Sequence, residues 1–242
     1  TFAFELIPLM TISQVIINDV DYTDVFYREG ASNNVLVPIE EIAEGDMISA
    51  QIFYSGTPDG GSFFVGVDND YSPAWQKYMK GTLSEPFAAS DWFAVKQDLE
   101  DKADSCWVFL TTNSENMAGS QGVLTDVVDL GDGNTRYEWK SNYPIAYYLI
   151  SFAVSEYQDY SIYAFPEQMN GDSVLIQNFI YDAPGCLEYY QEDIDETPAM
   201  VELLSDLYIL YPFHEEKYGH CLTRLGGGME HQTMTTISNF GF

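Results

Sequence analysis

The fold class is decided by the stretch Gly122–Lys140, which reads GVLTDVVDLGDGNTRYEWK. Two runs rich in β-branched and aromatic residues, Gly122 to Leu130 and Arg136 to Lys140, lie on either side of Gly131-Asp132-Gly133-Asn134. Residues of these types suit strands, and glycine beside Asp or Asn suits the tight turn of a hairpin. The stretch therefore predicts two antiparallel strands joined by a short turn.

Runs of the same kind recur up to about Asp182, separated by turn residues and with almost no helical periodicity between them. They are Thr1–Leu9, Ile12–Val20, Asn34–Ile39, Ile48–Tyr54, Phe63–Val67, Cys106–Thr112, Ala146–Val154, Ser161–Phe165 and Ser173–Tyr181. The segment Ser72–Lys102 is less regular and is predicted to be a long excursion between sheets. This pattern predicts a mainly β fold, with antiparallel sheets packed as a sandwich or saddle over residues 1–182.

The pattern changes after Pro184. The five carboxylates of Glu188–Glu196 are interpreted as a solvated linker that approaches a helix. Thr197 suits the helix N-cap and Pro198 the first turn, and an apolar series at helical spacing follows, made of Met200, Leu203, Leu204, Leu207 and Tyr208. One amphipathic helix is therefore predicted to begin a second unit, residues 183–242, which has too few residues for a core of its own.

The chain is strongly acidic, with 38 Asp and Glu against 9 Lys and Arg and a formal charge of −29. Such a field repels phosphate backbones, so nucleic acid is a poor partner. The sequence has no apolar run of about 18 residues, so we expect no membrane-spanning segment. The chain opens directly in a strand-like pattern, and we expect both ends to be cut points within a longer protein.

The three cysteines, Cys106, Cys186 and Cys221, have no C-x-x-C spacing. Neither a zinc ribbon nor a disulfide framework is therefore predicted, and one pair plus one free thiol stays open. Cys106 lies within a strand-like run, where a buried thiol acts as a small apolar side chain.

Two segments contain residues that suit chemistry. In Gly226-Gly227-Gly228-Met229-Glu230-His231, flexible glycines lead into a methionine and a carboxylate, a pattern that suits a peptide-binding edge. A flexible loop with a surface carboxylate is the plainer alternative. The run His214-Glu215-Glu216-Lys217-Tyr218 begins like the zinc motif H-E-x-x-H but has Tyr218 in place of the second histidine, so we predict no metal ligand in this chain.

Three stretches, in order along the chain, resemble the aminopeptidase N-like zinc metallopeptidases. The first is Leu83-Ser84-Glu85-Pro86 with Asp91-Trp92-Phe93, and the second is Tyr143–Phe152. The third joins Tyr211-Pro212-Phe213 to Gly227-Gly228-Met229-Glu230, which is similar to the G-x-M-E-N motif of the family. The chain departs from the family pattern at Ser84, Ala94, Val95 and His231.

The resemblance implies a β-saddle N-terminal domain followed by the first helix and edge strands of a thermolysin-like α+β catalytic domain. By resemblance, Glu230 and Glu85 would bind the free α-amino group of a peptide substrate, next to Gly227, Gly228 and Met229. Zinc is expected in the full-length protein, with its H-E-x-x-H ligands after Phe242. The catalytic residues would lie there too, so the 242-residue chain is expected to be inactive without the remainder of the catalytic domain.

Two other functions fit the sequence. A non-catalytic, secreted β-sandwich module for binding or scaffolding would keep the architecture without the chemistry. A carbohydrate-binding sandwich is a further reading, based on Trp75, Trp92, Trp107 and Trp139. Acidity and the family's habits predict a bacterial protein that is secreted, periplasmic or at the cell surface.

Overall fold

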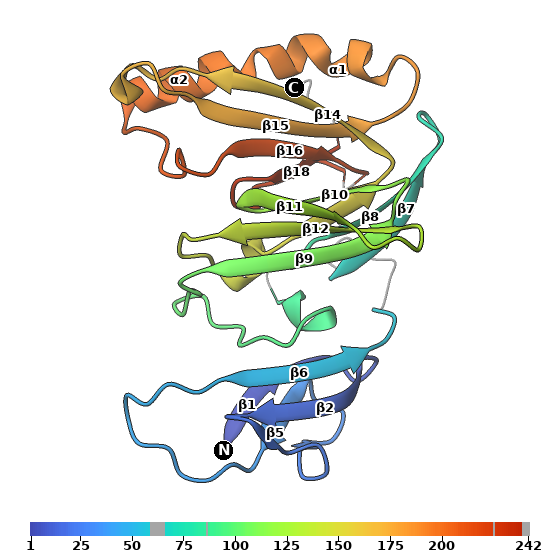
Figure 1. Cartoon of the computed structure of the whole chain (residues 1–242), viewed down its shortest axis with the longest axis vertical. Coiled ribbons are helices and arrows are strands. Elements are labelled where there is room, and N and C mark those ends of the chain that lie inside the picture. The colour runs from blue at the N-terminus through green and yellow to red at the C-terminus, as the bar shows by residue number, and fades with distance from the viewer. Residues whose placement is uncertain (59–65, 86, 225, 239–242) are drawn as a thin grey trace.

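The computed structural model describes residues 1–58, 66–85, 87–224 and 226–238. Within them the fold is mainly β, as predicted, with five sheets and two α-helices. Figure 1 shows the sheets stacked in three layers along the long axis, with the N-terminal strands at one end and the two helices covering the last sheet at the other. None of the helices in these ranges is both long and apolar enough to cross a membrane.

The N-terminal layer contains two small antiparallel sheets that share one core. The first has the order β1-β5-β4 and the second the order β3-β2-β6. Phe4, Leu6, Val15 and Val35 are among the buried side chains that fill the space around them. The strands are β1 (Phe2–Glu5), β2 (Thr11–Ile17), β3 (Val20–Asp21), β4 (Tyr27–Arg28), β5 (Asn34–Val37) and β6 (Ala50–Ser55).

The middle layer contains the predicted hairpin. Strand β11 pairs antiparallel with β12, with Val128 opposite Arg136, and Gly131 and Gly133 take positive φ angles in the turn. Its sheets have the orders β11-β12-β9 and β10-β13-β8-β7. The strands are β7 (Val67–Ser72), β8 (Lys77–Thr82), β9 (Cys106–Asn113), β10 (Met117–Ser120), β11 (Val123–Asp129), β12 (Asn134–Ser141) and β13 (Phe152–Ser155), and 3-10 turns form at Ala89–Asp91 and Tyr147–Leu149.

The C-terminal layer is a five-stranded sheet with the order β14-β15-β16-β18-β17. Strand β15 pairs in parallel with β16, and β16 in parallel with β18. The sheet therefore joins strands from both sides of the boundary expected at residue 182, and that division stays a prediction. The elements are β14 (Tyr157–Ala164), a 3-10 turn (Glu167–Met169), β15 (Val174–Tyr181), α1 (Cys186–Asp195), α2 (Thr197–Leu207), β16 (Tyr218–Leu222), β17 (Gly228–Met229) and β18 (Thr235–Ile237).

Two local expectations were wrong. The segment Ser72–Lys102 contains strand β8, which lies between β13 and β7. The segment Glu188–Glu196 lies almost wholly in helix α1, which buries Cys186, Tyr190 and Ile194 at four-residue spacing. Residues four apart share one helix face, so the carboxylates can lie on the other faces. Most of the run predicted at Phe63–Val67 lies outside the described residues.

The predicted helix over Thr197–Leu207 is confirmed as α2, with a small shift at its start. Glu196 is the N-cap residue, and Thr197 and Pro198 are the first two residues of the helix. Proline is favoured at this end because the first backbone N–H groups of a helix have no partner within it.

Candidate functional site

The segment that contains Glu230 lies at the edge of the C-terminal sheet. Gly228 and Met229 form the short strand β17, which pairs with β18 and is the last strand in the sheet order. Ser238 N–H donates to Gly227 O at 2.9 Å, and Gly227 N–H donates to the Ser238 hydroxyl oxygen at 2.8 Å. An edge strand keeps one row of backbone groups available for another strand. The geometry therefore allows an extended peptide to add beside β17.

Glu230 follows β17 and is exposed at the wall of a cavity of about 580 Å³. The cavity lies between α2 and the C-terminal sheet, and Gly228 also lines it. Its other walls are mainly apolar and include Met200, Leu204, Ile209, Tyr211 and Ile237. A carboxylate at the wall of an apolar space suits a ligand that carries both a cation and an apolar group.

Helix α2 presents most of its predicted apolar stripe to solvent. Its buried residues are Thr197 and Ser205. The exposed apolar side chains of α2 and of the two residues after it, which we call the α2 stripe, are Met200 (55%), Leu203 (57%), Leu204 (54%), Leu207 (64%), Tyr208 (78%) and Ile209 (69%). An apolar surface that is continuous over several residues commonly marks an interaction site.

Glu85 lies in the turn after β8 and is half-buried. It is not among the residues that line the cavity beside Glu230. Its neighbour Ser84 is fully buried, and the Ser84 hydroxyl accepts a hydrogen bond from Trp92 Nε1 at 3.0 Å. Ser84 therefore fixes the Trp92 ring, and the convergence of Glu85 and Glu230 on one ammonium group stays a prediction.

His231 is 1% exposed, and its Nδ1 lies 2.8 Å from the Thr236 hydroxyl oxygen. Burial lowers the pKa of His231 to about 3, so the ring is neutral at pH 7. Nε2 of His231 and Nε2 of Gln232 have no hydrogen-bond partner among the described residues. His231 is thus a buried residue of the turn that follows Glu230.

Sequence reasoning missed the environment of His220 and Lys217. His220 lines the cavity, and its Nδ1 lies 2.7 Å from the Asn178 amide oxygen. Burial lowers the pKa of His220 to about 4 and that of Lys217 to about 7. Nothing in the sequence signals a buried lysine directly before strand β16.

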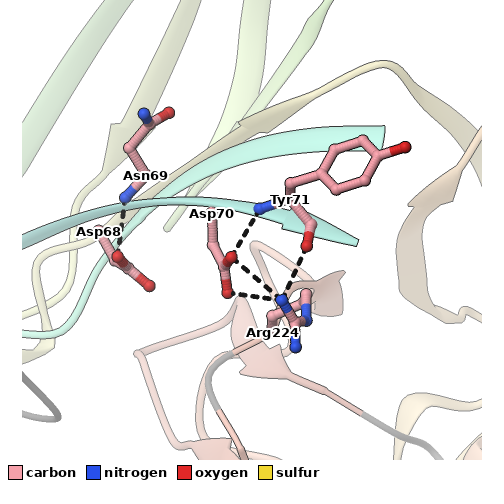
Figure 2. A network of polar contacts seen from close by, with 5 residues as sticks. All are labelled: Asp68, Asn69, Asp70, Tyr71 and Arg224. Atoms are coloured by element: carbon pink, nitrogen blue, oxygen red, sulfur yellow. Dashed lines mark hydrogen bonds and ion pairs between the residues drawn. The ribbon is translucent and has the colours of Figure 1, made fainter. Parts of the chain in front are cut away.

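A salt bridge joins the middle layer to the loop that leads to the glycines (Figure 2). Arg224 Nη1 donates to both carboxylate oxygens of Asp70 at 3.1 Å and to the carbonyl oxygen of Tyr71 at 2.7 Å. The residues Asp68-Asn69-Asp70 have oxygen ligands but lack the later Gly and Glu of a calcium loop, and they lie within strand β7. The Asp70 carboxylate is therefore bound to a cationic side chain of the same chain.

The described residues do not form a zinc site. No three His, Cys, Asp or Glu side chains among them lie close enough together to hold a metal ion. His214 and the residues up to Glu216 lie in turns before β16, where His214 Nδ1 is 3.0 Å from the Tyr211 carbonyl oxygen. All three cysteines are free, and Cys186 and Cys221 are buried. We therefore assign no step of zinc chemistry to these residues.

The tryptophans do not form one surface. Trp139 is fully buried, and Trp92 packs between Phe93 and Phe152. Trp75 is half-buried against Tyr189 and Tyr190, and only Trp107 is largely exposed, at 61%. Aromatic sugar sites need exposed rings, so this arrangement favours core packing.

Comparisons with known proteins identify the fold. Neither a scan against models of protein families nor a search of curated proteins found a match. Among solved structures, an M1 zinc metallopeptidase from Deinococcus radiodurans matches with a TM-score of 0.79 at 17% identity over 98% of this chain. A mutant of that enzyme bound to a Tyr-Ser-Ala substrate matches at 0.74 and 18% identity.

A further match is a two-domain M1 zinc metallopeptidase mutant bound to L-arginine, with a TM-score of 0.76 and 19% identity. The present chain spans about half of the length of these structures, 52% in each case. Identities this low establish a shared fold. The chain therefore has the fold of about half of an M1 zinc metallopeptidase.

Proposed function

We propose that this chain is the N-terminal half of a zinc-dependent aminopeptidase, in which it binds the free N-terminus of a peptide substrate. One observation carries the proposal. Glu230 directly follows edge strand β17 at the wall of a cavity of about 580 Å³, in a chain that shares its fold with M1 zinc metallopeptidases over 98% of its length.

The chemistry of amine binding follows from this placement. A substrate backbone would pair with β17, where Gly228 presents no Cβ to the approaching strand. The Glu230 carboxylate would accept hydrogen bonds from the α-ammonium group, and Glu85 would provide a second carboxylate. An ammonium has three N–H donors and an internal peptide nitrogen has at most one, so such a site selects chain ends.

We further propose that the zinc ligands belong to a remaining part of the polypeptide, which would pack on the α2 stripe and complete the cavity. Two observations support this: the chain spans 52% of the length of the structures that it matches, and the stripe leaves six large side chains more than half exposed. The 242-residue chain alone is then expected to be inactive. The excess of acidic residues fits an exported protein, which we propose as its setting.

Two measurements on the 242-residue chain test the proposal. Release of p-nitroaniline from amino-acid p-nitroanilides should be absent, and chelator-sensitive release would contradict the expected inactivity. In an NMR titration, L-leucinamide, which has a free α-ammonium group, should bind more tightly than N-acetyl-L-leucinamide.

The titration has matched variants. Glu230→Gln and Glu85→Gln should each weaken leucinamide binding, whereas Glu115→Gln, in the exposed turn after β9, should not. Equal binding of the acetylated compound, or no effect of Glu230→Gln, would favour the non-catalytic scaffold.

A further inference from the structure

The turn that follows Glu230, residues His231–Met234, is buried against its surroundings. His231 N–H donates to Met229 O at 2.9 Å, and Met234 N–H donates to His231 O at 3.2 Å. Thr233 has a φ of 60°, in the left-handed region that β-branched residues rarely adopt. A backbone held in this region needs support from its surroundings.

The side chain of Lys217 supplies part of that support. Its Nζ donates to the Thr233 carbonyl oxygen at 2.8 Å and to the Ser120 carbonyl oxygen, at the end of β10, at 3.2 Å. Met234 Sδ lies 3.6 Å from Nζ, and the centre of the Trp139 ring lies 5.0 Å away. These four neighbours are acceptors or electron-rich groups, which suits the three N–H donors of an ammonium.

The backbone N–H of Gly122 also supports Thr233. Its N–H donates to the Thr233 hydroxyl oxygen at 2.8 Å. Gly122 has a φ of 83°, and a Cβ at this position would lie 2.3 Å from the Lys140 carbonyl oxygen. Only glycine fits here, and the conformation it allows presents the N–H to the turn.

We propose that Lys217 is a positioning residue: with the Gly122 N–H, it holds Thr233 against the middle layer and thereby fixes the direction in which Glu230 enters the cavity. Lys217 acts through the turn and does not touch a ligand. The functional meaning of this inference rests on the proposed amine-binding role of Glu230, but the positioning of the turn can be measured without it.

The first test compares amide hydrogen exchange in residues 231–236 with that in strands β9 and β12. Lys217→Met keeps the length of the side chain and removes the donor. Thr233→Val removes the acceptor of the Gly122 N–H, and Thr233→Ser keeps it. Lys96→Met, at an exposed ion pair, is the control for loss of a lysine.

Lys217→Met and Thr233→Val should each raise exchange in the turn by about tenfold or more, with less than about threefold change in β9 and β12. Thr233→Ser and Lys96→Met should match the wild type. Unchanged exchange in the turn, or an equal rise in the reference strands, would overturn the proposal. If Lys217→Met does not fold, the difference in turn exchange between Thr233→Val and Thr233→Ser tests the proposal.

The second test is leucinamide binding by the same variants. If the wild type binds, Lys217→Met and Thr233→Val should weaken binding at least about fivefold, and full affinity in both would contradict the positioning role. A wild type that does not bind leucinamide removes the proposed function of Glu230. The exchange measurement then decides the positioning role by itself.

Discussion

The side chains of His231 and Thr236 join the turn after Glu230 to strand β18, because Nδ1 of the imidazole lies 2.8 Å from the hydroxyl oxygen. Both residues are buried, at 1% and 3% exposure. The Glu230 segment therefore has a packed inner face, although Glu230 itself is exposed.

The buried imidazole predicts a specific loss of stability in acid. The folded-state pKa of His231 is about 3, against 6.5 in its unperturbed form, because burial disfavours the charged ring. Between these values the unfolded state binds a proton that the folded state does not, so the free energy of unfolding falls as pH decreases through that window. Its contribution is on the order of 5 kcal/mol over the whole window.

His231→Asn should therefore make the free energy of unfolding less dependent on pH between about 6.5 and 4, measured by urea unfolding at several pH values. The matched variant is His214→Asn, which removes a half-buried histidine from the turns before β16 and controls for the loss of an imidazole. An identical slope for His231→Asn and the wild type would show that His231 does not titrate as the structure implies.

The low pKa of Lys217 predicts a second pH dependence of the free energy of unfolding, above pH 7. Burial lowers its pKa to about 7 from 10.5, with Cys221 and Glu216 as the neighbours that oppose this shift. Above pH 7 the folded state loses a proton that the unfolded state keeps, so the free energy of unfolding should rise toward pH 8.5. Lys217→Met should reduce this rise, on the order of 1–2 kcal/mol, in urea unfolding, and Lys96→Met should not.

Because the α2 stripe is exposed, we expect charged substitutions there to have little effect on the free energy of unfolding. Leu203→Glu and Leu207→Glu replace side chains that are 57% and 64% exposed, so each should change the free energy of unfolding by less than about 0.5 kcal/mol. Binding of the dye ANS should fall because less apolar surface is available. Ile194→Glu, at a fully buried position of α1, should unfold the chain or destabilise it by several kcal/mol. A similar loss of stability in Leu203→Glu or Leu207→Glu would mean that other parts of the chain pack on the α2 stripe.

The middle and C-terminal layers lie so close together at Gly119 in β10 that there is no space for a side chain. A Cβ at Gly119 would lie 2.4 Å from Cys221 Sγ and 3.0 Å from Met234 Cε. Gly119→Ala should therefore destabilise the chain by about 1–3 kcal/mol through overpacking, measured by urea unfolding.

Gly228→Ala is the matched control, because its nearest neighbours would lie at 3.8 Å or beyond. It should leave the free energy of unfolding near the wild-type value. A Gly119→Ala variant as stable as Gly228→Ala would show that the two layers can separate locally without cost.

The salt bridge between Arg224 and Asp70 predicts a small energetic coupling. Both side chains are more than one third exposed, and such pairs contribute about 0.2–1 kcal/mol. A double-mutant cycle with Arg224→Ala and Asp70→Ala, measured by urea unfolding, should give a coupling in this range that decreases at high salt. A coupling of several kcal/mol would mean that the pair is more buried than the structure shows.

Local patterns predicted the elements whose signal lies within a few neighbouring residues. The hairpin over Gly122–Lys140 and the helix over Thr197–Leu207 form where turn residues and apolar spacing indicated them. Strand β8, Lys77–Thr82, was missed because Lys77, Lys80 and Thr82 interrupt its apolar alternation. Helix α1 was missed because its composition, rich in carboxylates, is typical of a solvated linker, and only the four-residue spacing of Cys186, Tyr190 and Ile194 indicates a helix.

The candidate site was predictable only in part, for the same physical reason. The glycines and Glu230 are consecutive, so their pattern is visible in the sequence. The Lys217 ammonium instead contacts Ser120, 97 positions earlier, and no local pattern encodes such a pair. Whether Glu85 and Glu230 act on one ligand is likewise a question of long-range geometry and stays a prediction.

The parallel pairing of β15 with β16 has a consequence for how the chain could be divided. Cleavage after Asp182 would remove the neighbour that covers one side of β15 and leave Ile176, Gln177, Asn178 and Phe179 as a bare sheet border. Exposed borders of this kind recruit strands from other molecules. The first 182 residues are therefore expected to aggregate when expressed as a separate piece.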